Sequence, residues 1–174
     1  MIKISKNTYE FDGDVCIGYT SNGEKFLIDA DKYSLIKDIS WSYNSCGYVC
    51  GNISIDGKQH RIKLHRLVTN CPEGMCVDHI HGSDTRYDNR SCNLRICTYA
   101  QNAQNVTCQK RNKYKAKGVS LAKCGTYQAQ IQINGKLKYL GSFKTIKEAA
   151  DAYDKAAKEH FGEFARLNNY KEEK

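Results

Sequence analysis

Long apolar runs are missing from this sequence of 174 residues, whose mean hydropathy is −0.66. No stretch approaches the roughly 20 apolar residues that a membrane-spanning helix requires. The N-terminal segment MIKISKNTYE also lacks the apolar core of a signal peptide. We therefore expect a soluble protein without membrane contacts that works in the cytoplasm.

A compact and even set of cysteines is missing as well. The nine cysteines are an odd number, and without a signal peptide we expect reduced thiols that pack as small apolar groups. Cys71 with Cys76, and Cys92 with Cys97, nevertheless flank a polar loop, as zinc ligands often do. Their separation differs from the usual Cys-x2-Cys, which argues against a structural zinc, and metal analysis would settle this alternative.

Acidic residues are absent between residues 110 and 144, where nine lysines or arginines occur. The whole chain has a net charge of +8, so this stretch holds all of the excess positive charge. A concentrated positive surface favours a polyanion such as nucleic acid as its partner. The alternative is a solvated face whose counter-charges lie elsewhere.

Proline is nearly missing, since Pro72 is the single one in the chain. The basic connector 109–113 contains neither a proline nor a Gly/Ser tract. We therefore expect the two halves on either side of this connector to be closely linked rather than loosely tethered.

Residues 1–63 have the pattern of a β-rich module. Two hairpins are predicted, with turns at residues 21–24 and 56–57, because Asn-Gly and Asp-Gly favour tight turns. A short helix through Ile36, capped by an aspartate, is expected between them. The module has no concentrated chemistry, so the sequence leaves open whether it supports the next unit or extends a binding surface.

The stretch 76–105 contains the densest polar chemistry of the chain. Short apolar runs begin at Val77 and at Leu94 and flank a loop rich in Gly, Ser, Asp and Asn, which predicts two strands joined by a loop. Thr98 and Gln101 match a capping box, so a helix is expected to start at Thr98. This order of elements would bring a carboxylate, an imidazole and an amide together.

These three groups suit metal-assisted hydrolysis of a phosphodiester. Asp78 and the side-chain carbonyl of Asn102 are hard oxygen ligands of the kind that Mg²⁺ prefers. His79 is able to accept a proton from water near neutral pH. One divalent ion here would stabilise the charge that develops on the phosphate. Otherwise the same residues are ordinary loop and capping residues.

The spacing of these residues resembles the motif of the HNH nucleases, specifically of phage and intron-encoded homing endonucleases. Asn93 follows His79 by fourteen residues, and Asn102 comes nine residues later. The resemblance implies a ββα-metal unit over 64–108, with His79 as the general base. It implies that Asp78 and Asn102 bind one divalent metal, Mg²⁺ or Mn²⁺. It also implies that Asn93 fixes the loop backbone and thereby orients the general base.

Other residues near the motif have an open interpretation. The segment 64–68 resembles the stretch that precedes the motif in these enzymes, but nothing in the sequence places His65 near the predicted metal ligands, so we interpret it as a structural histidine. Arg86, Arg90 and Arg95 are able to contact backbone phosphates or to be solvated. We assign Arg95 to DNA binding.

The last part of the chain predicts three strands followed by one helix. The strands are expected at residues 118–123, 126–133 and 136–140, with an Asn-Gly turn between the second and the third. Strict alternation in the second strand gives one packing face and one polar face of glutamines. A capping box at Thr145 begins an alanine-rich amphipathic helix, which ends at Gly162.

The segment 114–168 resembles the APETALA-two-type DNA-binding domain of plants, which is also found attached to phage HNH enzymes. Matching stretches include YLGSF at residues 139–143 and EAADAY at residues 148–153. The resemblance implies that the sheet lies in the major groove of double-stranded DNA, where glutamines are able to read adenine edges. Several arginines of the plant domains are replaced, which suggests a different target, and a solvated strand face is the alternative. In addition to Arg95, the residues expected to contact DNA are Lys117, Ser120, Lys123, Gln130, Gln132, Lys136, Lys138 and Tyr139.

These patterns predict an α+β protein: a β-rich module, a ββα-metal nuclease unit, a three-stranded sheet with one helix, and a charged tail at 169–174. The predicted function is site-directed cleavage of DNA, of the homing type, in the cytoplasm of a bacterial host cell. No heptad pattern suggests a dimer, so we expect a monomer. The alternative function is a sequence-specific DNA-binding regulator in which the nuclease-like unit is only a scaffold.

Overall fold

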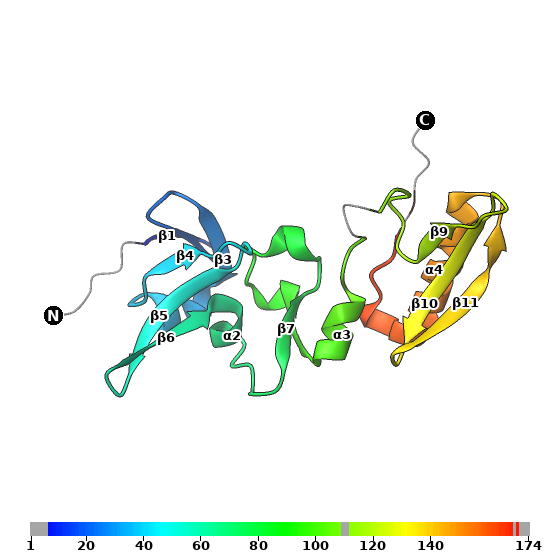
Figure 1. Ribbon diagram of the computed structural model, residues 1–174. Helices are drawn as coiled ribbons and strands as arrows, with labels where there is room; N and C mark the ends of the chain where they lie inside the picture. The colour runs from blue at the N-terminus through cyan, green and yellow to red at the C-terminus, as the bar shows by residue number, and fades with distance from the viewer. Residues whose placement is uncertain (1–6, 109–111, 169, 171–174) are drawn as a thin grey trace. The chain divides into compact units, whose positions relative to one another are not determined.

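The computed structural model describes residues 7–108, 112–168 and 170 (Figure 1). The chain forms two compact units, Met1–Asn102 and Ala103–Lys174. The boundary expected after residue 63 lies inside the first unit, so the β-rich module and the predicted nuclease elements belong to one body. Residues 109–111 of the predicted connector, and all of the predicted tail except Tyr170, lie outside the described residues.

Two three-stranded antiparallel sheets form the beginning of the first unit. They consist of β1 (Thr8–Asp12), β2 (Val15–Tyr19) and β3 (Lys25–Asp29), and of β4 (Trp41–Tyr43), β5 (Val49–Ile55) and β6 (Lys58–Lys63). Both predicted hairpins are present, and Asp56 and Gly57 take positive φ values of 49° and 75° at the second turn. The edge strands β1 and β4 were not predicted. Each is short and mixes polar and apolar residues, so its sequence has no clear strand pattern.

One apolar core joins these sheets to the short helices η1 (Ala30–Lys32), α1 (Tyr33–Ile36) and α2 (Leu64–Val68). Trp41 is almost fully buried, and its indole Nε1 donates a hydrogen bond of 3.0 Å to the Ile36 carbonyl. The Asn7 side chain ties the two sheets together, since its Nδ2 donates to the carbonyls of Tyr19 and Trp41. The aspartate cap expected for the helix is absent, because the Asp29 side chain makes no capping bond to η1.

A two-stranded hairpin and the beginning of a short helix complete the first unit. The hairpin consists of β7 (Cys76–His79) and β8 (Leu94–Cys97), with η2 (Ser83–Thr85) and η3 (Ser91–Asn93) in its loop. The helix α3 (Tyr99–Gln104) follows directly. The predicted capping box is confirmed: Thr98 N donates to Gln101 Oε1 at 2.8 Å, and Gln101 N donates to Thr98 Oγ1 at 3.2 Å.

The second unit is a three-stranded antiparallel sheet covered on one face by a helix (Figure 1). Its strands are β9 (Val119–Leu121), β10 (Tyr127–Ile133) and β11 (Lys136–Phe143), with β10 in the centre. The helix α4 (Ile146–Phe161) starts in the predicted capping box at Thr145 and is followed by η4 (Gly162–Phe164). Ala129 and Ile131 of β10 are buried beneath the small side chains of α4.

Within the described residues, no helix has the length and apolar character needed to cross a membrane.

Gly118 fixes the approach of α4 to the sheet, and this gives a stability prediction. Its φ is +75°, and a Cβ atom there would overlap the Tyr153 ring and lie 2.5 Å from the Gln130 carbonyl oxygen. We expect Gly118→Ala to reduce the free energy of unfolding by about 3 kcal/mol, combining left-handed strain with overpacking. Gly125 also has a positive φ but has open space around it, so Gly125→Ala is the matched control, with an expected loss of about 1 kcal/mol. Urea unfolding followed by circular dichroism measures both, and equal losses would contradict the packing argument.

Candidate functional site

The hairpin places Asp78 opposite Arg95, and the two side chains form a buried ion pair. Arg95 Nε and Nη2 both donate to Asp78 Oδ2, at 2.9 and 2.7 Å. Asp78 is 5% exposed, so this carboxylate is held in one orientation with its charge compensated. The contact also engages the guanidinium of Arg95, a residue that we predicted from the sequence to bind DNA.

His79 lies next in the strand and belongs to a cluster of aromatic rings. Its ring packs edge-on against His65 of α2, with a centroid distance of 5.3 Å. Tyr48, just before β5, packs against both histidines at 5.2 and 6.0 Å. His65 and His79 are both buried, and the predicted general base packs against side chains from two other segments of the first unit.

The environment of this cluster keeps the two imidazoles neutral. Burial lowers the pKa of His79, and the Asn89 side chain and the charge of Asp78 oppose that effect. Burial, followed by the neighbouring His79, Lys63 and Arg66, lowers the pKa of His65 to about 3. A neutral imidazole is the form that accepts a proton, so a lowered pKa extends general-base competence to more acidic pH.

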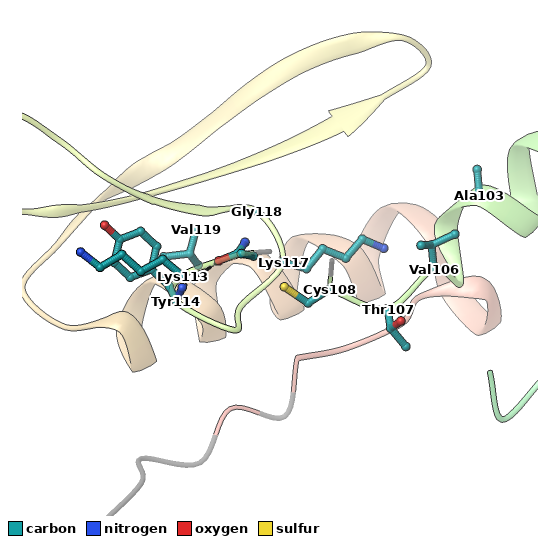
Figure 2. Close-up of a pocket in the computed structure, with 10 residues that line it drawn as sticks. Ala103, Val106, Thr107, Cys108, Lys113, Tyr114, Lys117, Gly118 and Val119 are labelled. Atoms are coloured by element: carbon teal, nitrogen blue, oxygen red, sulfur yellow. Dashed lines mark hydrogen bonds between the residues drawn. The ribbon is translucent and has the colours of Figure 1, made fainter. Parts of the chain in front are cut away.

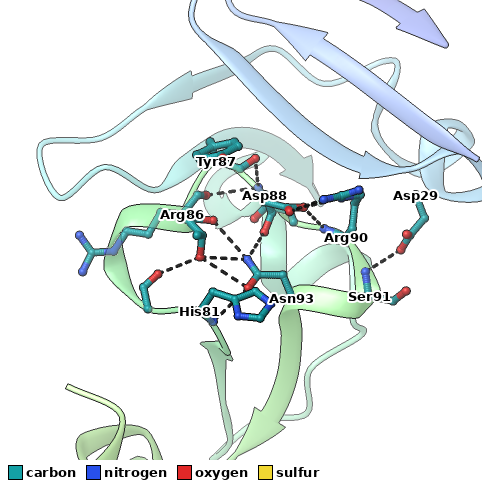
Figure 3. A network of polar contacts seen from close by, with 11 residues as sticks. Asp29, His81, Arg86, Tyr87, Asp88, Arg90, Ser91 and Asn93 are labelled. Carbon is teal, nitrogen blue, oxygen red and sulfur yellow. Dashed lines mark hydrogen bonds and ion pairs between the residues drawn. The ribbon is translucent and has the colours of Figure 1, made fainter. Parts of the chain in front are cut away.

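Asn93 is completely buried and holds the loop between β7 and β8 (Figure 3). Its Oδ1 accepts a bond from His81 N at 3.2 Å, and its Nδ2 donates to Asp88 O at 2.9 Å and to Thr85 Oγ1 at 3.1 Å. The Asn93 carbonyl also accepts from Ile80 N at 2.9 Å. One residue therefore fixes both sides of the loop that follows His79.

The first sheet of the unit holds the same loop from outside. Leu27 N of β3 donates to Tyr87 O, and Asn89 N donates to Leu27 O, both at 2.8 Å. The Asp29 carboxylate accepts from Ser91 N at 2.8 Å, so it anchors the loop instead of capping a helix (Figure 3). The β-rich module thus supports the site, one of the two roles that the sequence left open.

Asn102 lies in the first turns of α3, where its N–H donates to the Thr98 carbonyl at 3.0 Å. Among the described residues, no three His, Cys, Asp or Glu side chains are grouped to hold a metal ion. Cys76 lies opposite Cys97, with their Sγ atoms 3.5 Å apart. A carboxylate and an amide oxygen are nevertheless donors that fit Mg²⁺, which keeps most of its ligands as water.

Comparison with known proteins establishes the family. The chain is 30% identical over 149 residues to an uncharacterized HNH endonuclease of Acanthamoeba polyphaga mimivirus, a match that covers 82% of this chain and 73% of that protein. This chain belongs to the HNH endonuclease family. A solved structure of DNA binding and cleavage by the HNH homing endonuclease I-HmuI is 23% identical, with a TM-score of 0.35 and coverage of 83% of this chain and 82% of that one. No family profile matches the chain.

The arginines of this HNH endonuclease loop differ in their partners. Arg90 forms a two-pronged ion pair with Asp88, at 2.8 Å from Nε to Oδ1 and 2.6 Å from Nη2 to Oδ2. Arg95 is paired with Asp78, as described above. Arg86 instead donates from Nη1 to the Cys46 carbonyl at 2.8 Å, and among the described residues it has no carboxylate partner.

The residues assigned to DNA in the second unit do not all lie on one surface. Ser120 and Gln130 belong to the sheet face opposite α4, and strand pairing places Tyr139 and Gln132 there too. Lys136 and Lys138 pair with Ile133 and Ile131, which puts both lysines on the face that α4 covers, and Lys138 Nζ lies 3.3 Å from His160 Nε2. Lys123 is exposed in the turn between β9 and β10.

Lys117 lies in a different environment again, beside a cavity of about 690 Å³ in the second unit (Figure 2). Its Nζ donates to the Gln104 carbonyl at 2.8 Å and lies 5.9 Å from the centre of the Tyr153 ring. Burial lowers its pKa. The cavity is lined by residues between 103 and 119, so it contains none of the predicted catalytic or metal-binding residues.

Sequence reasoning missed Tyr48 and underestimated His65. Tyr48 stands in an unremarkable turn of the β-rich module, and no local pattern points to the nuclease residues. The signal for His65 was the resemblance of segment 64–68 to the stretch that precedes the motif. Its ring contact with His79 places this segment beside the predicted general base.

The buried His65 predicts a specific acid sensitivity. Because its folded pKa of about 3 lies below the value near 6.5 of an unfolded chain, the unfolded state binds more protons between these pH values. Stability from this group is therefore complete above about pH 6.5 and falls as pH decreases. Between pH 7 and pH 5 the wild type should lose about 2 kcal/mol more than His65→Phe, which has no titrating group there.

Urea unfolding at several pH values measures this difference. Above pH 7.5 the two proteins should differ by a constant amount, which serves as the internal control. An identical loss from pH 7 to pH 5 in both proteins would show that His65 is not held neutral by burial.

Proposed function

We propose that this HNH endonuclease is a site-directed DNA endonuclease of the homing type. The observation that supports it best is the buried pair Asp78 and His79, held on a hairpin whose loop is fixed by Asn93. His79 accepts a proton from the water whose oxygen attacks the phosphorus. The bond from phosphorus to the 3′ oxygen breaks, and the products carry a 5′-phosphate and a 3′-hydroxyl.

Within this proposal, Asp78 and Asn102 hold one divalent ion, Mg²⁺ or Mn²⁺. When bound, that ion supplies positive charge at the scissile phosphate. Arg95 holds the Asp78 carboxylate in one orientation through its two hydrogen bonds to Oδ2. Asn93 acts as a positioning residue, because its bonds to the loop fix the backbone that follows His79.

In this proposal the second unit is an APETALA-two-type domain that selects the DNA site to be cleaved. The sheet face opposite α4 presents hydrogen-bonding side chains next to exposed Leu137 and Tyr139. Gln130 and Gln132 stand on this face, and Gln side chains are able to bond to adenine edges in the major groove. The positive charge of the stretch 110–144 adds affinity for the phosphate backbone.

Cleavage of supercoiled plasmid that carries candidate target DNA tests the catalytic part. We expect nicked or linear DNA with Mg²⁺ and none with EDTA. His79→Ala should reduce the rate by about 10²- to 10⁴-fold, the usual contribution of a general base. His60→Ala is the matched control, because it removes an exposed histidine from the same unit and should leave the rate unchanged.

Full activity in His79→Ala would remove this histidine from the mechanism. Binding without cleavage, on a substrate shown by footprinting to contain the site, would instead favour the sequence-specific DNA-binding regulator.

The role of the sheet is tested by selection of bound sites from a random duplex pool. Gln130→Ala and Gln132→Ala should each reduce the preference for the selected site over random DNA by about 1–3 kcal/mol. The control is Lys158→Ala on the exposed side of α4, which should leave the preference unchanged. An unaltered preference in both glutamine variants would show that this face does not read bases.

A further inference from the structure

The first unit contains two positive side chains that have no carboxylate partner among the described residues and that meet over one aromatic ring. The Arg86 guanidinium carbon lies 4.6 Å from the centre of the Tyr48 ring, and Lys63 Nζ lies 4.9 Å from it. The neighbouring arginines differ in this respect, because Arg90 and Arg95 are each neutralised by an aspartate. Two positive charges without a carboxylate partner among the described residues therefore lie at the Tyr48 ring.

Tyr48 also connects these cations to the catalytic residues. The same ring packs against His79 at 6.0 Å and against His65 at 5.2 Å. The cations therefore lie beside the proposed general base. The three residues come from separate segments, since Tyr48 precedes β5, Lys63 ends β6 and Arg86 follows η2.

The geometry of Arg86 leaves it prepared to bind an anion. Its Nη1 donates to the Cys46 carbonyl at 2.8 Å, and the aromatic ring supports the guanidinium, so the side chain is ordered before any ligand arrives. A guanidinium has five N–H donors, and only one such bond is formed here, so others are able to reach a phosphate oxygen. Lys63 is exposed and adds a second positive charge at the same ring.

We propose that Tyr48, Lys63 and Arg86 form a phosphate-binding subsite that holds a backbone phosphate of DNA beside His79. The subsite rests on the proposed nuclease function and adds the residues that position the substrate for it. In this arrangement Arg86 and Lys63 contact phosphate oxygens, and Tyr48 orders both cations without contacting the reacting atoms.

The salt dependence of DNA binding tests the subsite without relying on catalysis. The full-length protein is titrated into a short labelled duplex in EDTA at several salt concentrations, and log K is plotted against log salt. Each lost phosphate contact should reduce the magnitude of the slope by about 0.9. We expect this reduction in Arg86→Gln and in Lys63→Gln, and about twice as much in the double variant.

Two matched variants control for charge and for folding. Arg86→Lys keeps the charge and should retain most of the wild-type slope. Lys58→Gln removes an equal charge at the far end of β6 and should leave the slope unchanged. Wild-type slopes in both Arg86→Gln and Lys63→Gln would overturn the subsite. An equal reduction in Lys58→Gln would also overturn it, because any charge on the unit would then suffice.

A second measurement connects the subsite with catalysis. At saturating plasmid, Arg86→Gln should slow single-turnover cleavage by about 10- to 100-fold, the range for a charge-assisted hydrogen bond, with partial recovery in Arg86→Lys. An unchanged cleavage rate would place the bound phosphate away from the reacting centre and overturn that part of the proposal. If the wild type binds DNA but never cleaves it, the proposed function fails, while the salt slopes still decide whether the subsite binds phosphate.

Discussion

The buried amide of Asn93 is the interaction on which the first unit depends. It has no contact with solvent, so every hydrogen bond that it makes to the loop is formed in a low-dielectric environment. Replacing it with an apolar residue would leave the His81 N–H and the Asp88 carbonyl without these bonds. The loop has little apolar surface of its own, and this polar network substitutes for a core.

Charged residues of the same type have different partners in the first unit. Asp78 and Asp88 each form an ion pair with one arginine, which compensates the charge of both partners and orients the carboxylates. Arg86 is held by a carbonyl and an aromatic ring instead, neither of which cancels its charge. Three arginines of one short stretch therefore have different electrostatic roles, and their partners decide which role each has.

Features encoded over a few residues were predictable from the sequence. The capping boxes at Thr98 and Thr145 and the tight turn at residues 56–57 depend on neighbours within four positions, and all are present. The sequence also allows a prediction of which β11 side chains face α4. A two-residue turn pairs Ile133 with Lys136 and so places that lysine on the face that α4 covers. The assignment of Lys136 and Lys138 to DNA contact did not use this local rule.

Features that depend on long-range contacts were not predictable. Tyr48 meets His79 only because β5, α2 and β7 pack together, and no periodicity in the sequence records that packing. The backbone bonds between Leu27 and the loop are of the same kind, since they need no particular side chain. The desolvation of His65 follows from the completed fold rather than from its neighbours in the chain.

The attachment of the loop to β3 limits where the first unit can be divided without loss of contacts. A crossover after residue 63 would separate the loop from Leu27 and Asp29, which hold it through bonds of 2.8 Å. A crossover after residue 102 would leave those bonds intact, although it would divide α3. The early β-strands and the loop that they hold are therefore structurally inseparable, although they lie far apart in the sequence.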